Sequence, residues 1–313
     1  MTTGLQADRA TMRALVTDGR GGVEAADVPV PRPNPGEALV RVLATSLNRG
    51  ELRFVEVTSG AVPGWDVAGE LVEDVPAAGL DRGTLVVGLV DEGAWAEYAA
   101  VPLAHLAPLP GGVCPAEAAA LPTAGLTALQ SLRLSGSLLG RRALITGAAG
   151  GVGRFAVQLA AASGADVTAV ARDAARGAGL RQLGADAVVT SLDGLESFDF
   201  ILESVGGETL TRAFALLAPG GDLVSIGQSS REPGVFEPRL LFNGAYGARI
   251  HPYMVFEGAR GIAGRDLAIL LELVRRGRLD PQVERTLGWR EVDGALADLA
   301  ERRVAGKAVL LVD

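Results

Sequence analysis

Two different spacings of hydrophobic residues divide this chain of 313 residues into a β-rich first third and an α/β remainder. In the first third, short apolar segments are separated by turns rich in glycine and proline, such as 31–36, and this pattern predicts strands without long helices between them. The expected strands are Met12–Asp18, Ala38–Thr45, Ala68–Glu73 and Thr84–Val90. Strands at such short spacing are typical of an antiparallel or barrel-like domain.

From about Pro115 onward, nearly continuous apolar segments alternate with segments of helical length that are rich in alanine and leucine. The alternation predicts βαβ units around a buried parallel sheet, because helices cover both faces of such strands. Helices are expected over Pro115–Ser131 and Arg154–Ser163. Strands are expected over Arg142–Thr146, Val167–Ala171, Ala187–Thr190, Phe198–Leu202 and Asp222–Gly227.

The C-terminal part returns to the first pattern, with helices expected over Arg265–Arg276 and Glu291–Ala300 and a strand over Lys307–Val312. A strand this apolar needs a partner, and pairing with the N-terminal strands would make the β-rich domain discontinuous. We therefore expect residues 1–121 and 254–313 to form one domain and residues 122–253 to form the other.

Composition narrows the functional classes. The net charge is −8 without a basic block, which argues against a nucleic-acid partner. The single cysteine, Cys114, excludes an internal disulfide and a multi-cysteine metal site. No segment reaches the roughly 18 apolar residues of a membrane span, and the first twelve residues contain no apolar signal segment. We expect a soluble cytoplasmic protein without a membrane partner.

The glycine-rich turn Ile145–Gly153 follows an expected strand and precedes an expected helix, as a dinucleotide-binding fingerprint requires. Gly150 would let a pyrophosphate approach the backbone, and Gly153 would let the helix pack against the strand. The N-terminus of the helix would offer free N–H groups to the phosphates. Ala148 stands where the strict pattern has its first glycine. A tight strand–helix corner is the alternative interpretation, and the surrounding βα repeats favour the dinucleotide site.

The residues after the next strand indicate which dinucleotide is bound. An acidic residue there would bond the adenosine ribose 2′-hydroxyl, whereas an arginine would favour a 2′-phosphate. Arg172 follows the strand directly and Arg176 lies one turn further, while Asp173 is expected to cap the following helix. The pattern favours NADP(H) over NAD(H), and the alternative is that both arginines are solvated residues at a helix start.

Six short motifs run through nearly the whole chain: Leu47-Asn48, Pro63–Gly69, Gly93–Tyr98, Leu121–Ala128, Glu203–Gly207 and Gly306-Lys307. In this order and spacing the sequence resembles the medium-chain dehydrogenase/reductase superfamily, and within it the zinc-independent quinone oxidoreductase and enoyl reductase branch. The resemblance implies an α/β fold. A Rossmann domain with a doubly wound parallel sheet would interrupt a discontinuous GroES-like β-rich catalytic domain.

The resemblance also exposes a departure from the zinc alcohol dehydrogenases of the superfamily. Asn48 matches the first zinc-binding cysteine of those enzymes, and Trp65-Asp66 matches their His-Glu pair. Asparagine and tryptophan cannot supply the ligands of a catalytic zinc, so we expect no metal. Without a Lewis acid, the favoured acceptor is a quinone or an enone, since the charge delivered with the hydride delocalises onto a carbonyl oxygen.

The resemblance places Asn48 beside nicotinamide and substrate, and the alternative interpretation is that Asn48 stabilises a local turn. Many relatives have a tyrosine a few residues after this asparagine, where this chain has Arg53, and Tyr246 is another candidate donor or an interface aromatic. The catalytic candidates are Asn48, Arg53 and Tyr246. The cofactor-binding candidates are Asn48, Thr127, Ala149, Gly150, Gly151, Val152, Gly153, Arg172, Arg176, Val205, Gly227 and Asn243.

Two functions remain open. The first is an NADPH-dependent, zinc-independent reductase of a quinone or an α,β-unsaturated carbonyl, including a polyketide-type intermediate. The second is a non-catalytic NADPH-binding sensor or crystallin-like protein. An NAD-linked zinc alcohol dehydrogenase is disfavoured by the missing ligands. Relatives commonly dimerise through the edge strands of their Rossmann sheets, so a homodimer through 248–255 is expected.

Overall fold

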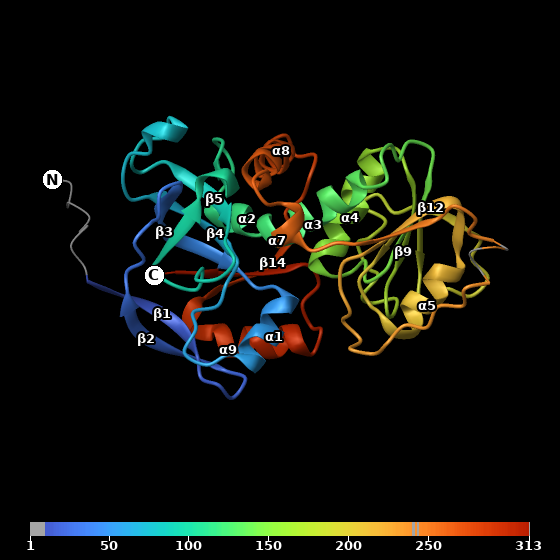
Figure 1. The fold of residues 1–313 in the computed structure, drawn as a ribbon, viewed down its shortest axis with the longest axis horizontal. Helices are drawn as coiled ribbons and strands as arrows, with labels where there is room; N and C mark the ends of the chain where they lie inside the picture. Colours follow the sequence, from blue (N-terminus) through green and yellow to red (C-terminus); the bar gives the residue numbers. More distant parts are fainter. Residues whose placement is uncertain (1–9, 240–241, 243, 313) are drawn as a thin grey trace. The chain divides into compact units, whose positions relative to one another are not determined.

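The structure is a computed structural model that describes residues 10–239, 242 and 244–312. The described chain divides into two compact units (Figure 1). Unit 1 comprises the residues up to Leu126 together with those from Ala259 to the C-terminal end, and unit 2 comprises Thr127–Gly258. No helix of the described residues is long and apolar enough to cross a membrane.

Unit 1 is built around a seven-stranded sheet. Its strands are β3 (Glu37–Ser46), β4 (Asp66–Leu71), β5 (Leu85–Leu89), β6 (Tyr98–Pro102), β7 (Leu106–Pro108), β14 (Val283–Gly288) and β15 (Lys307–Leu311). The strand order is β14-β15-β3-β4-β5-β7, and β6 also pairs with β3. A separate hairpin consists of β1 (Thr11–Thr17) and β2 (Val23–Pro29). The helices of this unit are α1 (Arg49–Val57), α2 (Pro115–Ala119), α8 (Ala263–Arg275) and α9 (Val292–Ala300), with short 3-10 turns at Pro76–Ala78, Leu103–His105 and Trp289–Glu291.

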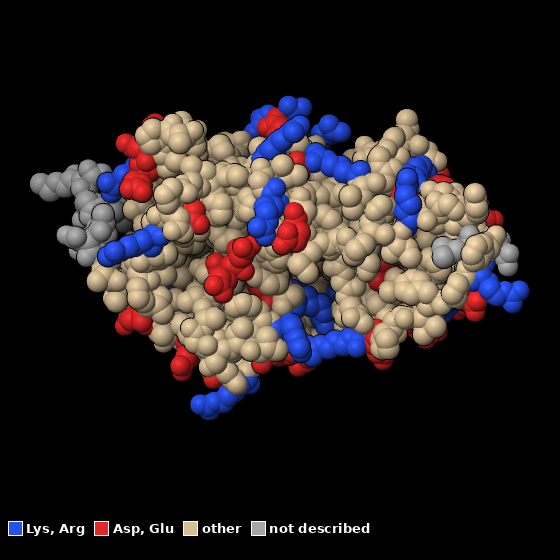
Figure 2. Space-filling view, in the orientation of Figure 1, with Lys and Arg blue, Asp and Glu red and all other residues tan. Residues whose placement is uncertain are grey.

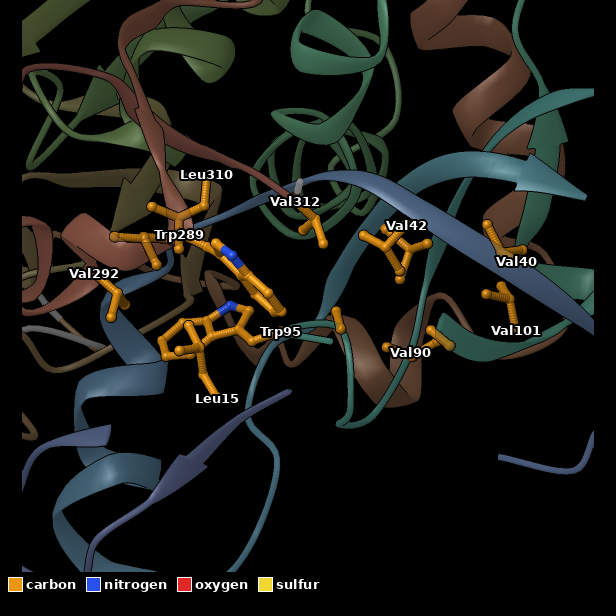
Figure 3. Packing of buried hydrophobic residues seen from close by; sticks show 14 of the residues in the cluster. Leu15, Val40, Val42, Val90, Trp95, Val101, Trp289, Val292, Leu310 and Val312 are labelled. Atoms are coloured by element: carbon orange, nitrogen blue, oxygen red, sulfur yellow. The ribbon is translucent and has the colours of Figure 1, made fainter. Parts of the chain in front are cut away.

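The C-terminal strand β15 pairs antiparallel with β3, with Val309 opposite Ser46. The predicted return of the terminal strand to the N-terminal β-rich region is thereby confirmed. The apolar core of this unit includes Trp95 and Trp289, whose indole rings lie among aliphatic side chains such as Leu15 and Leu310 (Figure 3). The pairing therefore buries Ala308, Val309 and Leu310 of β15 and fixes its first residue, Lys307, in the interior, whereas Leu311 stays exposed.

Unit 2 contains a six-stranded, fully parallel sheet in the order β10-β9-β8-β11-β12-β13. Its strands are β8 (Arg142–Ile145), β9 (Asp166–Val170), β10 (Ala187–Val189), β11 (Phe198–Glu203), β12 (Leu217–Ser225) and β13 (Arg249–Pro252). Its helices are α4 (Gly151–Ala162), α5 (Gly207–Ala215) and α7 (Val255–Gly258). The chain order reverses between β8 and β11, which is the doubly wound Rossmann arrangement. The predicted fold class is confirmed.

The structure corrects two expectations about local structure. The segment Pro115–Ser131, which was expected to be one helix, forms two helices, α2 and α3 (Pro122–Arg133). The boundary between the two units falls after Leu126, within α3. Proline at 122 lacks the N–H that a continuous helix needs and restricts the residue before it.

The second correction concerns the segment after β9. No helix forms there, and residues 174–183 make a run of turns that includes Gly179 with a positive φ of 81°. The Asp173 carboxylate accepts the N–H of Arg176 at 2.8 Å, so Asp173 closes a turn and does not cap a helix.

Candidate active site

In unit 2, the glycine-rich turn lies at the carboxyl end of β8, where the order of the strands reverses. Ligands of open parallel sheets bind at this point. Gly147 has a positive φ of 57°, and the N–H of Ala148 donates to the carbonyl oxygen of Val170 at 3.0 Å. This bond ties the turn to the end of β9.

The two glycines singled out by the motif meet different surroundings. A Cβ on Gly153 would lie 2.4 Å from the oxygen of Gly147 and 2.6 Å from Cα of Ala148, so the helix can pack here only without a side chain. A Cβ on Gly150 would come no closer than 3.3 Å to its nearest atom. Gly150 is the N-cap of α4, whose first-turn N–H groups have no acceptor within the helix. The turn therefore fits a phosphate-binding cradle.

The loops after β11 and β12 lie at the same edge of the sheet. Glu203, at the end of β11, is completely buried and accepts the N–H groups of Val205 at 2.8 Å and Gly206 at 3.1 Å. Burial raises the pKa of Glu203, and these N–H groups partly offset that rise. Thr146 Oγ1 donates to Glu203 at 3.1 Å, which joins this loop to the glycine-rich turn.

Arg172 and Arg176 follow β9 at the same carboxyl edge. The side chain of Arg172 is 60% exposed, and its Nε lies 3.4 Å from Asp173 Oδ2. The bond from the N–H of Arg176 lowers the pKa of Asp173, with a smaller contribution from Arg172. Asp173, the acidic residue of this segment, thus accepts hydrogen bonds from a backbone N–H and from an arginine side chain. The segment therefore lacks an isolated carboxylate that would repel a 2′-phosphate.

In unit 1, a cluster of buried polar side chains surrounds Asn48; we call it the Asn48 cluster and define it as Ser46, Asn48, Glu51, Asp66, Thr123 and Lys307. Asn48 is the N-cap of α1 and is 7% exposed. Its Nδ2 donates to Asp66 Oδ2 at 2.8 Å, and its Oδ1 accepts a bond from Lys307 Nζ at 2.5 Å.

Asp66 is the acceptor at the centre of the Asn48 cluster. Its Oδ1 accepts both the N–H of Thr123 at 2.8 Å and the hydroxyl of Thr123 at 2.6 Å. Its Oδ2 accepts bonds from Asn48 and from the hydroxyl of Ser46, and lies 3.5 Å from Lys307 Nζ. A completely buried carboxylate needs this many donors and a cation, because desolvation of an unpaired charge is very costly.

Glu51 is the second buried carboxyl of the Asn48 cluster and is fully inaccessible to solvent. It accepts the N–H of Asn48 at 2.6 Å and the N–H of Trp65 at 3.0 Å. Burial raises the pKa of Glu51 to about 8, and the neighbouring charge of Asp66 adds to the rise, while Lys307 opposes it. At neutral pH Glu51 is therefore mainly protonated.

Comparisons with known proteins bear on both units. Residues 34–111 match the family described as alcohol dehydrogenase GroES-like domain, and residues 183–310 match the family described as zinc-binding dehydrogenase. The chain is 31% identical to the chloroplastic quinone-oxidoreductase QR1 of Triphysaria versicolor, over 96% of this chain and 98% of that protein. It is 29% identical to the trans-enoyl reductase pgmF of Aspergillus terreus, over 89% of this chain and 87% of that protein.

The quinone oxidoreductase of Coxiella burnetii has a similar solved structure, with a TM-score of 0.84 at 26% identity over 97% of this chain and all of that one. The chain belongs to the medium-chain dehydrogenase/reductase superfamily. Its relatives lie in the quinone oxidoreductase and enoyl reductase branch, and the chain is an oxidoreductase.

The name of the second matched family implies zinc, and the residues of this member of the superfamily do not fit that metal. Asn48 and Trp65 stand at the expected ligand positions, and the ammonium group of Lys307 lies within the Asn48 cluster. A fixed positive charge there opposes a divalent cation. Across the described residues, no group of three or more His, Cys, Asp or Glu is arranged to hold a metal ion.

The other predicted residues of this dehydrogenase/reductase fall into different places. Val205 and Gly227 follow β11 and β12 at the same edge of the sheet as the glycine-rich turn, and Thr127 is buried in α3. Arg53 lies on α1 with its side chain 72% exposed and 3.9 Å from Glu56, and Tyr246 is 76% exposed. Neither contacts the Asn48 cluster through a bond that the structure shows. Asn243 lies outside the described residues.

Sequence reasoning missed the roles of Glu51, Asp66 and Lys307 around Asn48. One signal was available: Lys307 is the only lysine of the chain, whereas the other 28 basic residues are arginines. The surface carries its charge through arginine and acidic side chains, which are interspersed on the face shown in Figure 2. The single lysine is instead 3% exposed.

Proposed function

We propose that the chain is an NADPH-dependent, zinc-independent reductase that transfers hydride to a conjugated acceptor, either a quinone or an α,β-unsaturated carbonyl compound. The single observation that carries the proposal is the Asn48 cluster. It has an amide and an ammonium group where a metal-dependent relative would need zinc ligands. The names of the relatives, a quinone oxidoreductase and a trans-enoyl reductase, support the same two acceptor classes.

A conjugated acceptor suits such a site because hydride adds to carbon while the negative charge moves to a carbonyl oxygen. The nicotinamide supplies the hydride when it is bound. Asn48 would orient the acceptor through the hydrogen-bonding capacity that its amide retains beside Asp66, Lys307 and Glu51. We assign the final proton to solvent and the protein's contribution to positioning of the acceptor.

The choice of NADP(H) rests on Arg172 and Arg176. Both lie at the carboxyl end of β9, next to the turn that would hold the pyrophosphate. A guanidinium group pairs with a phosphate through two parallel hydrogen bonds, whereas Asp173 is already bonded to both arginines. The turn itself, with Ala149, Gly151 and Val152 beside the two glycines, would contact the phosphates through backbone N–H groups.

The test is NADPH oxidation by the purified chain with benzoquinones, naphthoquinones, linear enones and a crotonyl thioester. We expect turnover with at least one of these classes and a slower reaction with NADH. Absence of turnover with every class would refute the proposal and favour a non-catalytic NADPH-binding protein.

An asparagine pair provides the matched variants. Asn48→Ala should lower kcat/KM for the acceptor about tenfold or more, on the scale of one lost charge-assisted contact, with the Kd of NADPH unchanged. Asn34→Ala removes an exposed asparagine of the same unit and should leave both quantities as they are. Equal activity of both variants would remove Asn48 from the site.

A further inference from the structure

Lys307 offers only donors, and its buried position gives it few partners. Its Nζ donates to the carbonyl oxygen of Leu47 at 3.0 Å and to Asn48 Oδ1 at 2.5 Å, and lies 3.5 Å from Asp66 Oδ2. Leu47 and Asn48 come immediately after β3, while Lys307 begins β15, which pairs with β3. A residue 259 positions away in the chain therefore contacts the proposed acceptor-binding asparagine.

These contacts permit only one orientation of the Asn48 amide. A half-turn of the amide group would exchange its oxygen and nitrogen, which are similar in size. Turned over, its N–H groups would point at the ammonium group of Lys307 and its oxygen would point at the carboxylate of Asp66. Both contacts would be repulsive in a buried site. Lys307 and Asp66 together fix the direction in which Asn48 presents its remaining donor and acceptor capacity.

The identity of the residue at 307 matters as well as its charge. An ammonium group is a compact point charge with three donors, whereas a guanidinium group is a planar fork that needs more room. The chain uses arginine for every other basic residue, and the single lysine lies where three oxygen atoms converge within a nearly closed interior.

We propose that Lys307 is a positioning residue for the reductase reaction: its ammonium group holds the Asn48 amide with the oxygen toward β15, and the acceptor is bound in the geometry that this orientation sets. The inference rests on the proposed function. Lys307 acts through Asn48 and does not itself touch the acceptor. It therefore affects the reaction of the acceptor and leaves the binding of NADPH to unit 2 unchanged.

The first experiment is a double-mutant cycle on kcat/KM for the acceptor. Lys307→Met should lower this constant about tenfold or more, and the same substitution made in Asn48→Ala should lower it less than twofold, because its target is already absent. Lys307→Arg should resemble Lys307→Met, since the larger group cannot occupy the same space. Equal factors in both backgrounds, or an unchanged rate in Lys307→Met, would overturn the proposal.

Two further variants separate positioning from folding. Lys307→Met leaves the Asp66 carboxylate without its cation and should lower the stability of the variant. Combining it with Asp66→Asn removes both charges and should restore the stability without restoring the rate. Val292→Ala removes apolar volume from the core of the same unit and should keep the rate at temperatures where it remains folded. A full rate in the Lys307→Met, Asp66→Asn variant would overturn the proposal.

A spectroscopic measurement does not depend on turnover. Because the chain has one lysine, protein grown with ¹⁵N- and ¹³C-labelled lysine should give a single Nζ–Cε signal. Asn48→Ala should shift that signal, and addition of duroquinone should shift it in the native chain but not in Asn48→Ala. If the native chain reduces no acceptor, the proposed function fails while this signal still decides whether Lys307 senses Asn48. A signal indifferent to both changes would overturn the contact.

Discussion

Replacing Glu51 by glutamine should flatten the pH dependence of the stability of unit 1. Glu51 is completely buried, and burial together with the Asp66 charge raises its pKa from 4.5 to about 8. The native state therefore holds a proton that the unfolded state has already released between these two pH values. The unfolded state binds fewer protons, so the free energy of unfolding falls as the pH rises from about 4.5 to about 8.

The size of this fall follows from the difference between the two pKa values of 4.5 and about 8. At 1.36 kcal/mol for each tenfold change in proton affinity, the full loss is roughly 5 kcal/mol. Glutamine cannot titrate, so the stability of Glu51→Gln minus that of the native chain should rise by this order between the two pH values and stay level above them. A glutamine side chain has one acceptor oxygen, so it can accept only one of the two backbone N–H groups that Glu51 accepts. The loss of the other bond lowers the whole difference curve by about 1 to 3 kcal/mol without changing its slope.

Tryptophan fluorescence during urea unfolding is a suitable assay, since all three tryptophans (Trp65, Trp95 and Trp289) belong to unit 1. The midpoint and slope of the unfolding transition should be measured at several pH values from 5 to 9 for the native chain, for Glu51→Gln and for a control variant. The control is Glu24→Gln, which changes an exposed carboxyl on β2 of the same unit and should show no comparable rise. A difference curve for Glu51→Gln that is level, or that falls with pH, would refute the assignment of the proton to Glu51.

Four further predictions concern the two units separately. Arg172→Glu should raise the KM for NADPH about tenfold or more and change that for NADH much less, which parallel titrations of the two cofactors would reveal. Gly153→Val should abolish NADPH binding measured by calorimetry, because its Cβ would lie 2.4 Å from the oxygen of Gly147, and retained binding would contradict the packing argument. Trp289→Ala should destabilise unit 1 by about 3 to 5 kcal/mol in the same urea assay, as for other large core residues. The expected homodimer can be tested by light scattering, where Ile250→Glu on the edge strand β13 should give the monomer mass and a native monomer would remove the proposal.

The sequence alone was sufficient for the fold class and for the position of the glycine-rich turn between β8 and α4. Both depend on local patterns: apolar strands alternating with helices, and glycines at the junction of β8 and α4. It was less reliable where a local signal competed with chain geometry. Pro122 divided an expected helix, and the segment after Asp173 formed turns, although its alanine-rich composition favours a helix.

The Asn48 cluster depended on tertiary structure. The sequence marked Asn48 and Trp65 as departures from a zinc site, but it could not show what replaces the metal. Glu51 is three positions from Asn48, whereas Asp66 and Lys307 are 18 and 259 positions away. Only the pairing of β15 with β3, and of β3 with β4, brings these charges together and excludes water from them. The proton on Glu51 and the orientation of the Asn48 amide follow from that burial, because the energies of charges depend on neighbours in space and on the loss of solvent.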